Sequence, residues 1–293
     1  MNTKELILER FGRLSPMLQA AARYVVDHPS EVVITSMRAL ATRAGAQPAT
    51  LVRLAQRLGY AGWPQLKAAF AKDLGLHSKT YGQRAKTLVG RVQDAGLIGE
   101  MFNALRGNLE VTETESAEAL RAAAKLLRGA KAVHVAGFRA STPVALSLVY
   151  GYRLFRNEVH LIDGGSGGLE MQLRAIERQH AVVVISFAPY SPEALAVIDT
   201  AKSVGARVVA FTDSRASPLA LASEKPVLFG VDSPSFFPSV AAGVAATEVL
   251  LEILAADTGE EAVRRIGRAE KQLFDSGAYM QPSQPLKRRP ITR

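Results

Sequence analysis

Residues 36–60 determine how the N-terminal part of the chain folds, and their sequence is SMRALATRAGAQPATLVRLAQRLGY. The pattern predicts two short helices joined by a tight turn. Gly45 ends the first helix, because glycine adopts the left-handed conformation at a helix end without steric cost. Pro48 suits the first turn of the second helix, where its missing N–H loses no hydrogen bond. The inward stripe of that second helix then consists of Leu51, Leu54, Ala55 and Leu58.

The opposite face of the second helix is polar and basic, with Gln47, Thr50, Arg53 and Arg57 on it. Two short helices, a glycine turn and such a face are typical of a helix-turn-helix, whose second helix enters the major groove of DNA. An ordinary helical hairpin with a solvated basic face has the same pattern. The distribution of charge along the chain helps to decide between these two interpretations.

The positive charge of the chain is concentrated in its N-terminal part. The formal net charge is +9, and residues 1–92 contain 14 basic and 5 acidic side chains. The other residues contain 22 of each sign, with a basic cluster in the last few positions and an acidic body before it. Because phosphate binding is dominated by such electrostatics, the N-terminal module is the part expected to bind double-stranded DNA.

The composition is that of a soluble globular protein with one large or two ordinary domains, since 48% of the 293 residues are hydrophobic and 22% are charged. The sequence has no cysteine, which excludes disulfides and thiolate metal sites and suits a reducing cytoplasm. Residues 1–5 lack the apolar core of a signal peptide, and no charge-free apolar run reaches about 18 residues. We therefore expect a cytoplasmic protein without a membrane partner.

The apolar periodicity divides the chain into four parts. The helices expected before residue 130 lie at 2–12, 16–27, within 36–60, 63–74, 97–111 and 116–127. They define an all-α helix-turn-helix domain over residues 1–77, followed by a linker and connecting helix over 78–114. The body is expected over residues 115–278. The Pro- and Gln-rich basic tail over 279–293 is expected to be disordered.

From residue 130 the pattern changes to alternating strands and helices. The expected strands lie at 132–136, 159–162, 181–185, 207–211 and 226–231. The expected helices lie at 143–155, 169–178, 192–204, 240–256 and 260–274. Residues 181–185 are apolar throughout, as in a parallel sheet that is covered on both faces. The body is therefore predicted to be an α/β domain with a doubly wound parallel sheet.

Small polar residues gather at three strand ends of this predicted sheet. They are Gly137, Arg139, Ser141 and Thr142 after the first strand, residues 163–168 after the second, and Ser186, Tyr190 and Ser191 after the third. In open α/β sheets, ligands bind beyond the carboxyl ends of the strands. Hydroxyls with helix N-termini behind them suit a phosphate or another small anion. Each serine also has an alternative interpretation as a helix N-cap.

No catalytic residue set or cofactor motif is evident in the sequence. The five histidines are His28, His77, His134, His160 and His180. They show no spacing typical of metal ligands, and a buried structural role is the better interpretation. The glycines after Asp163 match neither a dinucleotide fingerprint nor a P-loop. We therefore expect no cofactor, no metal and no catalytic activity.

With both halves placed, the chain over about residues 14–275 resembles the RpiR-type (MurR/RpiR) transcriptional regulators of bacteria. These join an N-terminal helix-turn-helix domain to a C-terminal SIS (sugar isomerase) domain. In the first domain the resemblance rests on residues 44–60 and 62–67. In the second it rests on Gly137, Ser141, residues 159–165, Ser186, Ser191 and residues 212–214. It implies DNA binding by the first domain and sensing of a phosphorylated sugar or another small anionic metabolite by the second.

One loop departs from the pattern of that family. The SIS phosphate loop usually has the pattern S-x-S-G-x-T, whereas here its middle serine and its glycine are replaced by Ala188 and Pro189. Pro189 has no N–H to donate to a phosphate. We therefore hypothesise that Arg139 and Tyr190 recognise an anion other than an ordinary sugar phosphate.

The helix-turn-helix interpretation gives individual residues a place at the DNA. We expect contacts with base edges from Gln47, Ala49, Thr50 and Arg53. We expect contacts with phosphates from Arg43, Arg57 and Lys67. The same DNA-facing surface is expected to include Ser36 and Pro48. Because a helix-turn-helix needs a two-fold partner to read a palindromic operator, we expect a homodimer or homotetramer. The alternatives are a sugar-phosphate isomerase or lyase, and a metabolite-binding module without specific DNA recognition.

Overall fold

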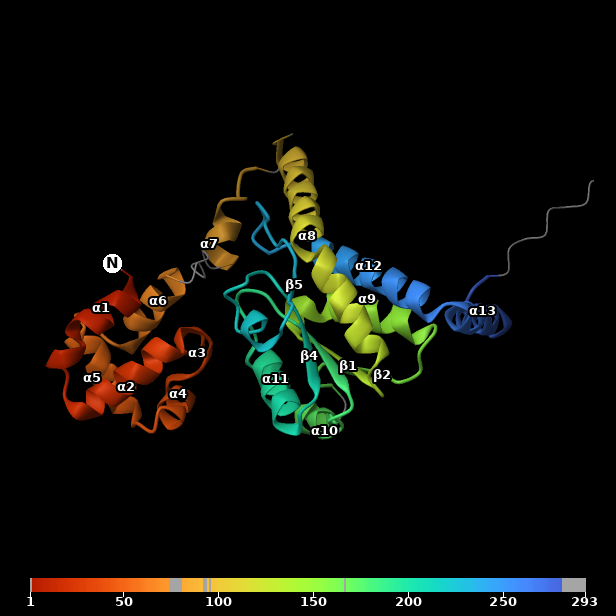
Figure 1. Cartoon of the computed structure of the whole chain (residues 1–293). Helices are drawn as coiled ribbons and strands as arrows, with labels where there is room; N and C mark the ends of the chain where they lie inside the picture. Colours follow the sequence, from red (N-terminus) through yellow and green to blue (C-terminus); the bar gives the residue numbers. More distant parts are fainter. Residues whose placement is uncertain (1, 74–80, 92–93, 95, 166, 281–293) are drawn as a thin grey trace, which may run out of the picture.

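The N-terminal unit is a bundle of α-helices. The computed structural model describes residues 2–73, 81–91, 94, 96–165 and 167–280 (Figure 1). The helices of this unit are α1 Thr3–Arg10, α2 Pro16–Asp27, α3 Pro29–Ile34, α4 Met37–Arg43, α5 Pro48–Arg57 and α6 Trp63–Asp73, with a 3₁₀ turn at Phe11–Arg13. The predicted all-α fold is confirmed, and the structure adds α3 to the predicted helices.

The turn between α4 and α5 has the predicted geometry. Gly45 takes a positive φ of 62°, a conformation that glycine adopts without strain. The N–H of Ala46 donates to the carbonyl of Ala41 at 2.8 Å, which closes the end of α4. The apolar stripes of both helices then face one core, which includes Leu40, Leu51, Leu54, Leu66 and Phe70.

A single long helix replaces the two helices predicted over 97–111 and 116–127. This helix, α8, runs over Gly96–Arg128 and crosses the domain boundary expected at residue 115. The polar residues before that boundary do not end it, because none is proline or glycine and the hydroxyls of Thr112 and Ser116 bond to backbone groups distant in sequence. The short helix α7, Tyr81–Lys86, lies within the expected linker. Residues 281–293 of the expected tail lie outside the described residues.

A five-stranded parallel sheet forms the centre of the second unit, as predicted. Its strands are β1 Val133–Gly137, β2 Val159–Ile162, β3 Ala181–Ile185, β4 Arg207–Thr212 and β5 Val227–Leu228, in the order β2-β1-β3-β4-β5. The helices are α9 Thr142–Arg153, α10 Gly168–Arg174, α11 Pro192–Val204, α12 Ala241–Thr258 and α13 Glu260–Asp275, with 3₁₀ turns at Arg139–Ser141 and Ala220–Ala222. The strand order reverses between β1 and β3, and ligands of open α/β sheets bind at such a switch point.

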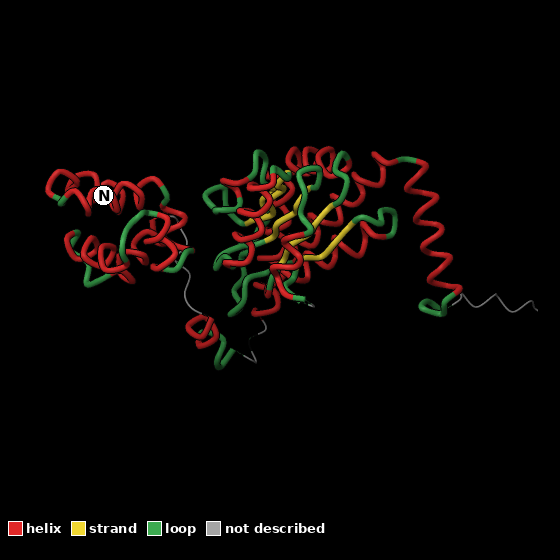
Figure 2. The backbone as a smooth tube through the Cα atoms, turned by 90° about the horizontal axis from the view of Figure 1, so that it is seen from below, coloured by secondary structure: helices red, strands yellow, loops and turns green. Residues whose placement is uncertain are grey.

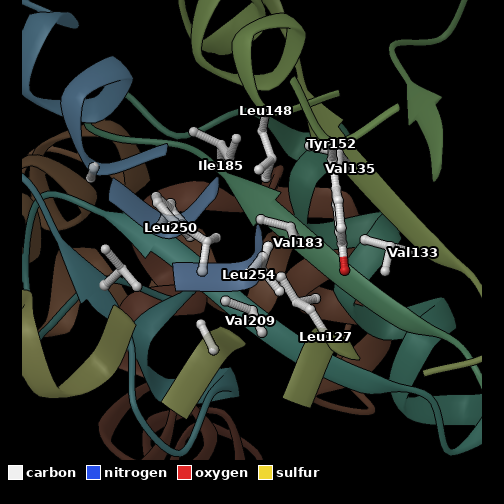
Figure 3. Packing of buried hydrophobic residues seen from close by; sticks show 14 of the residues in the cluster. Leu127, Val133, Val135, Leu148, Tyr152, Val183, Ile185, Val209, Leu250 and Leu254 are labelled. Atoms are coloured by element: carbon white, nitrogen blue, oxygen red, sulfur yellow. The ribbon is translucent and has the colours of Figure 1, made fainter. Parts of the chain in front are cut away.

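Helices cover both faces of the sheet (Figure 2). Val183 and Ile185 of β3 pack in one cluster with α8, α9 and α12, which Figure 3 shows from close by. Val182 and Val184 pack in the other cluster with α11, because successive side chains of a strand point to opposite faces. The strand is therefore apolar at every position. None of the helices in the described ranges is long and apolar enough to cross a membrane.

Side chains of α8 form hydrogen bonds along the outer edge of β5. The hydroxyl of Ser116 accepts from the N–H of Leu228 at 2.7 Å and donates to the carbonyl of the same residue at 2.6 Å. One helical turn earlier, the hydroxyl of Thr112 accepts from the N–H of Gly230 at 3.0 Å. Side chains of α8 thus form hydrogen bonds with every second residue of the chain where that chain leaves the sheet.

Asn108 continues this pattern by a further turn. Its amide accepts from the N–H of Asp232 at 3.0 Å and donates to the carbonyl of Asp232 at 2.7 Å. Four residues of helix rise about 6 Å and two residues of strand about 6.6 Å, so the two spacings match. A Cβ on Gly230 would lie 2.7 Å from the Cα of Asn108, so this close approach requires glycine. We call Asn108, Thr112 and Ser116 the α8 ladder.

Replacement of Ser116 by alanine is expected to lower the free energy of unfolding by about 1–3 kcal/mol, because it leaves the N–H and C=O of Leu228 without their partner. Thr114→Ala is the matched control, since Thr114 is exposed and its hydroxyl bonds only within α8. Urea unfolding followed by circular dichroism measures both variants. Equal stability of Ser116→Ala and Thr114→Ala would contradict the role given to the α8 ladder.

Candidate functional site

The exposed face of α5 carries a ridge of mainly polar side chains. Ala49, Arg53 and Gln56 follow one another at helical spacing and are all exposed. Arg57 lies beside them and is also exposed, and Gln47 is exposed at the N-cap. The outward orientation predicted for the arginines is therefore correct. A convex, cationic helix face of this kind fits the major groove of DNA.

Thr50 does not lie on this face, contrary to the prediction. Its side chain is buried, with only 4% of the residue exposed, and its hydroxyl donates to the Sδ of Met17 at 3.6 Å. The cause is that α2 packs against α5 on the side where Thr50 lies. Pro48 is half-buried in the first turn of α5.

A groove of about 590 Å³ separates the second half of α5 from the start of α2. It is lined by Ser15, Met17, Leu18, Thr50, Arg53, Gln56 and Arg57. Sequence reasoning missed Gln56, although helical spacing from Arg53 places it on the same face. It also missed Met17, which belongs to another helix and so carries no signal within residues 36–60.

Two further residues predicted at the DNA surface bind the ends of helices. Ser36 is the N-cap of α4, and its hydroxyl accepts from the N–H of Ala39 at 3.2 Å. Lys67 of α6 donates to the carbonyl of Thr35 at 3.0 Å. Burial lowers the pKa of Lys67. Both side chains therefore stabilise the helical unit, and a contact with DNA stays a prediction for them.

Arg43 contacts two carboxylates within the chain. It pairs with Glu31 at 3.1 Å and with Asp199 of α11 at 3.3 Å. The hydrogen bond to Glu31 raises the pKa of Arg43, and Glu31 also accepts from the hydroxyl of Tyr24 at 2.9 Å. A phosphate would compete with these carboxylates for the guanidinium.

At the other candidate site, Gly137 ends β1 at a close approach to α9. A Cβ at this position would lie 2.6 Å from the Cβ of Ala145 and 2.9 Å from the carbonyl oxygen of Ser141. The hydroxyl of Thr142 donates back to the carbonyl of Gly137 at 3.3 Å. Ser141 is buried and makes no capping hydrogen bond, so the N-cap alternative does not account for its hydroxyl.

The loop after β3 is organised around the carboxylate of Asp213, which directly follows β4. One oxygen accepts from the N–H of Ala188 at 3.1 Å, and the other accepts from the hydroxyl of Tyr190 at 2.8 Å. Burial raises the pKa of Tyr190, and Asp213 raises it further, so the phenol keeps its proton and donates. A carboxylate of the chain thus already binds two donors of the predicted anion loop.

The two outer serines of this loop bond to the backbone. The hydroxyl of Ser186 accepts from the N–H of Ser191 at 3.3 Å. The hydroxyl of Ser191 accepts from the N–H of Ala194 at 3.2 Å, so the N-cap alternative is right for Ser191. Because both oxygens act as acceptors, each O–H is still able to donate to a ligand.

Arg139 lies at the same edge of the sheet, and its charge is neutralised by Glu193. The guanidinium donates to both carboxylate oxygens, at 2.8 and 2.6 Å. These bonds raise the pKa of Arg139 and lower the pKa of Glu193. Arg139 also has a positive φ of 51°, which is uncommon for a residue with a side chain. The switch point therefore brings residues of the first and third predicted loops together, with Arg139 paired to Glu193 and Asp213 bound to two neutral donors.

Three histidines gather at the opposite, amino edge of the sheet. The ring of His134 lies 5.2 Å from that of His160 and 5.1 Å from that of His180, measured between centroids. The Nδ1 of His180 accepts from the N–H of Glu177 at 3.1 Å, so the Nε2 of His134, also 3.1 Å away, must donate to it. Burial and the neighbouring rings lower the pKa of His134 to about 4.

The predicted buried role is thus right for His134 and His180. It is wrong for His28 and His160, whose side chains are 45% and 46% exposed. His77 lies outside the described residues. In the part of the chain that the structure describes, no group of histidine and acidic side chains is arranged to hold a metal ion.

Two family models match the chain, one for each unit. The model of the "Helix-turn-helix domain, rpiR family" matches residues 1–76, and that of the "SIS domain" matches residues 126–253. The uncharacterized HTH-type transcriptional regulator YfhH of Escherichia coli K12 is 27% identical over 224 residues, which cover 72% of this chain and 76% of that protein. The bifunctional protein glk of Paraburkholderia xenovorans is 28% identical over 227 residues, 73% of this chain and 34% of that protein. The match thus spans about a third of the length of the bifunctional relative.

Two solved structures share the fold. The sugar isomerase domain of the RpiR transcription factor from Sphaerobacter thermophilus has a TM-score of 0.57 at 22% identity, covering 60% of this chain and 99% of that one. The Vibrio vulnificus NanR protein complexed with ManNAc-6P has a TM-score of 0.56 at 18% identity, covering 94% of this chain and 99% of that one. The second likeness extends over both units.

Proposed function

Since the chain belongs to the rpiR family of helix-turn-helix transcriptional regulators with a SIS domain, we propose that it binds operator DNA through the exposed face of α5. We propose further that a small anionic metabolite, bound at the switch point between β1 and β3, adjusts this binding. Such a protein acts where the chromosome is, in the cytoplasm.

The cationic ridge of α5 is the observation that carries the proposal. Arg53 and Arg57 are exposed on a helix that presents one face to solvent and packs its other face into the core. The surplus of positive charge lies in residues 1–92, which include this unit. A polyanion is attracted by such a surface, and its bases are read by the side chains that point into the groove.

The proposed operator is palindromic and is read by a homodimer or homotetramer. One helix-turn-helix reads only a few base pairs. A two-fold partner reads a second half-site, one turn of the DNA helix away from the first. Sedimentation of the chain with DNA containing one or two half-sites measures how many copies bind. A complex with one copy on the full operator would contradict this part of the proposal.

The proposed metabolite is a sugar phosphate or a related anion, and the proposed role of the SIS domain is binding rather than catalysis. The structural relative NanR was solved with ManNAc-6P, which supports this chemical class. At the switch point, Ser141, Ser186 and Ser191 provide hydroxyls, while Glu193 and Asp213 each bind a partner within the chain. Turnover of hexose phosphates by the purified chain would favour an isomerase or lyase instead.

Arg53→Ala is expected to weaken binding to the operator by about 1–3 kcal/mol and to relax its base preference at one position, because an arginine at a base edge discriminates. Arg57→Ala is expected to weaken binding to all sequences alike and to reduce the salt slope by about one, because it contacts a phosphate. Gel-shift titrations at several salt concentrations separate the two effects. Arg268→Ala, on the exposed side of α13, is the matched control. Unchanged affinity of Arg53→Ala would contradict the assignment.

A further inference from the structure

We propose that the groove between α2 and α5 reads an A·T base pair, with Gln56 bound to adenine and Met17 packed on the methyl group of thymine. This inference rests on the proposed DNA binding and assigns residues to the readout that the α4–α5 motif does not contain. It follows from the shape of the groove, from the exposure of the two side chains and from the charge around them.

Met17 is the first of these observations. It is a large apolar side chain that is 62% exposed, and it lies in the second position of α2 against Thr50 of α5. A methionine fills irregular apolar gaps because it is unbranched and polarizable. Beside the outer face of α5 it provides a large apolar contact, whereas Arg53, Gln56 and Arg57 provide polar ones.

Gln56 provides the complementary polar contact. It lies one turn beyond Arg53 on the exposed face and lines the same groove as Met17. Its side-chain amide carries a donor and an acceptor, which match the N7 acceptor and the N6 donor of adenine in the major groove. The thymine of the same pair presents its methyl group there, so one A·T pair offers a partner to each side of the groove.

The charge of the groove determines the class of its occupant. Arg53 and Arg57 line it, and no acidic side chain is among its lining residues. A groove of about 590 Å³ with two guanidinium groups attracts a polyanion, and of the polyanions only duplex DNA presents an adenine edge and a thymine methyl together. Arg57 then binds a phosphate, while Arg53 and Gln56 reach the bases.

The test uses binding sites selected from random duplex DNA by the full chain, followed by single-atom changes in the selected site. Replacing the contacted thymine by uracil removes only the methyl group, and is expected to weaken binding by the wild-type chain about fourfold. Replacing the contacted adenine by 7-deazaadenine removes the N7 acceptor, and is expected to weaken binding about tenfold. The penalty for uracil should vanish in Met17→Ala and persist in Met17→Leu. The penalty for 7-deazaadenine should vanish in Gln56→Ala.

Matched controls separate readout from general loss of binding. Met171→Ala and Gln272→Ala replace an exposed methionine of α10 and an exposed glutamine of α13, and should keep both penalties. If the wild-type chain selects a consensus site and the penalties are the same in Met17→Ala and Gln56→Ala, the inference is wrong while the proposed function stands. If the wild-type chain selects no consensus site, both the proposed operator and this readout are overturned.

Discussion

Replacement of Gly137 by alanine is expected to destabilise the SIS domain by about 3 kcal/mol, because the added methyl group has no room. The new Cβ would lie 2.6 Å from the Cβ of Ala145 and 2.9 Å from the carbonyl oxygen of Ser141. One of these neighbours is backbone, so β1 and the start of α9 must move apart. Overpacking of this kind typically costs 1–3 kcal/mol, and backbone displacement puts this case at the upper end.

Gly107→Ala is the matched control for this substitution. Gly107 lies inside α8, and nothing would come within 4 Å of a Cβ added there. Alanine is preferred over glycine in a helix interior by about 0.8–1.0 kcal/mol, so the control should be slightly more stable than the wild type. Urea unfolding measures both variants. A Gly137→Ala variant as stable as Gly107→Ala would show that β1 and α9 have room to separate.

Acidification from pH 6.5 to pH 4 is expected to lower the free energy of unfolding by up to about 3 kcal/mol through His134 alone. Its pKa is about 4 in the folded chain, mainly because of burial, against an ordinary value of 6.5. Between these values the unfolded chain binds a proton that the folded chain does not bind. The contribution of His134 is therefore complete above pH 6.5, and it is lost as the pH falls through the folded pKa.

His134→Gln isolates this contribution, since glutamine does not titrate. Other groups at the same edge are His160, His180, Glu158, Glu177 and Lys131. They are the same in both chains, so the difference in slope between wild type and His134→Gln reports the titration of His134 together with its coupling to the two neighbouring rings. Chemical unfolding at pH 7, 6, 5 and 4 measures it. Parallel stability curves for the two chains would contradict the lowered pKa.

Much of the fold could be predicted because local and tertiary signals agree. Gly45 and Pro48 define the turn of the first unit, and residues 181–185 are apolar at every position because helices cover both faces of the sheet. The long helix α8 could not be predicted, because its polar residues at 112–115 look like a helix boundary. Thr112 and Ser116 bond to Gly230 and Leu228, which are more than 100 residues away in sequence, so no local pattern reveals why the helix continues there.

The positions of the candidate sites could be predicted from the sequence, but not which side chains bind one another within them. The loops after β1 and β3 meet at the switch point, as strand topology requires. That Arg139 pairs with Glu193, and Tyr190 with Asp213, depends on the distance between loops, which periodicity does not contain. Thr50 shows the same limit on α5, because helical spacing alone cannot tell on which side α2 packs.

The α8 ladder also determines how this sheet meets other polypeptide chains. A strand at the edge of a sheet normally exposes a row of unpaired N–H and C=O groups, which can template pairing with another molecule. Here the α8 ladder binds the N–H groups of Leu228, Gly230 and Asp232 and the carbonyls of Leu228 and Asp232. A concentrated solution of the folded protein is therefore protected at β5 against edge-to-edge aggregation. Partial unfolding that releases α8 would remove this protection.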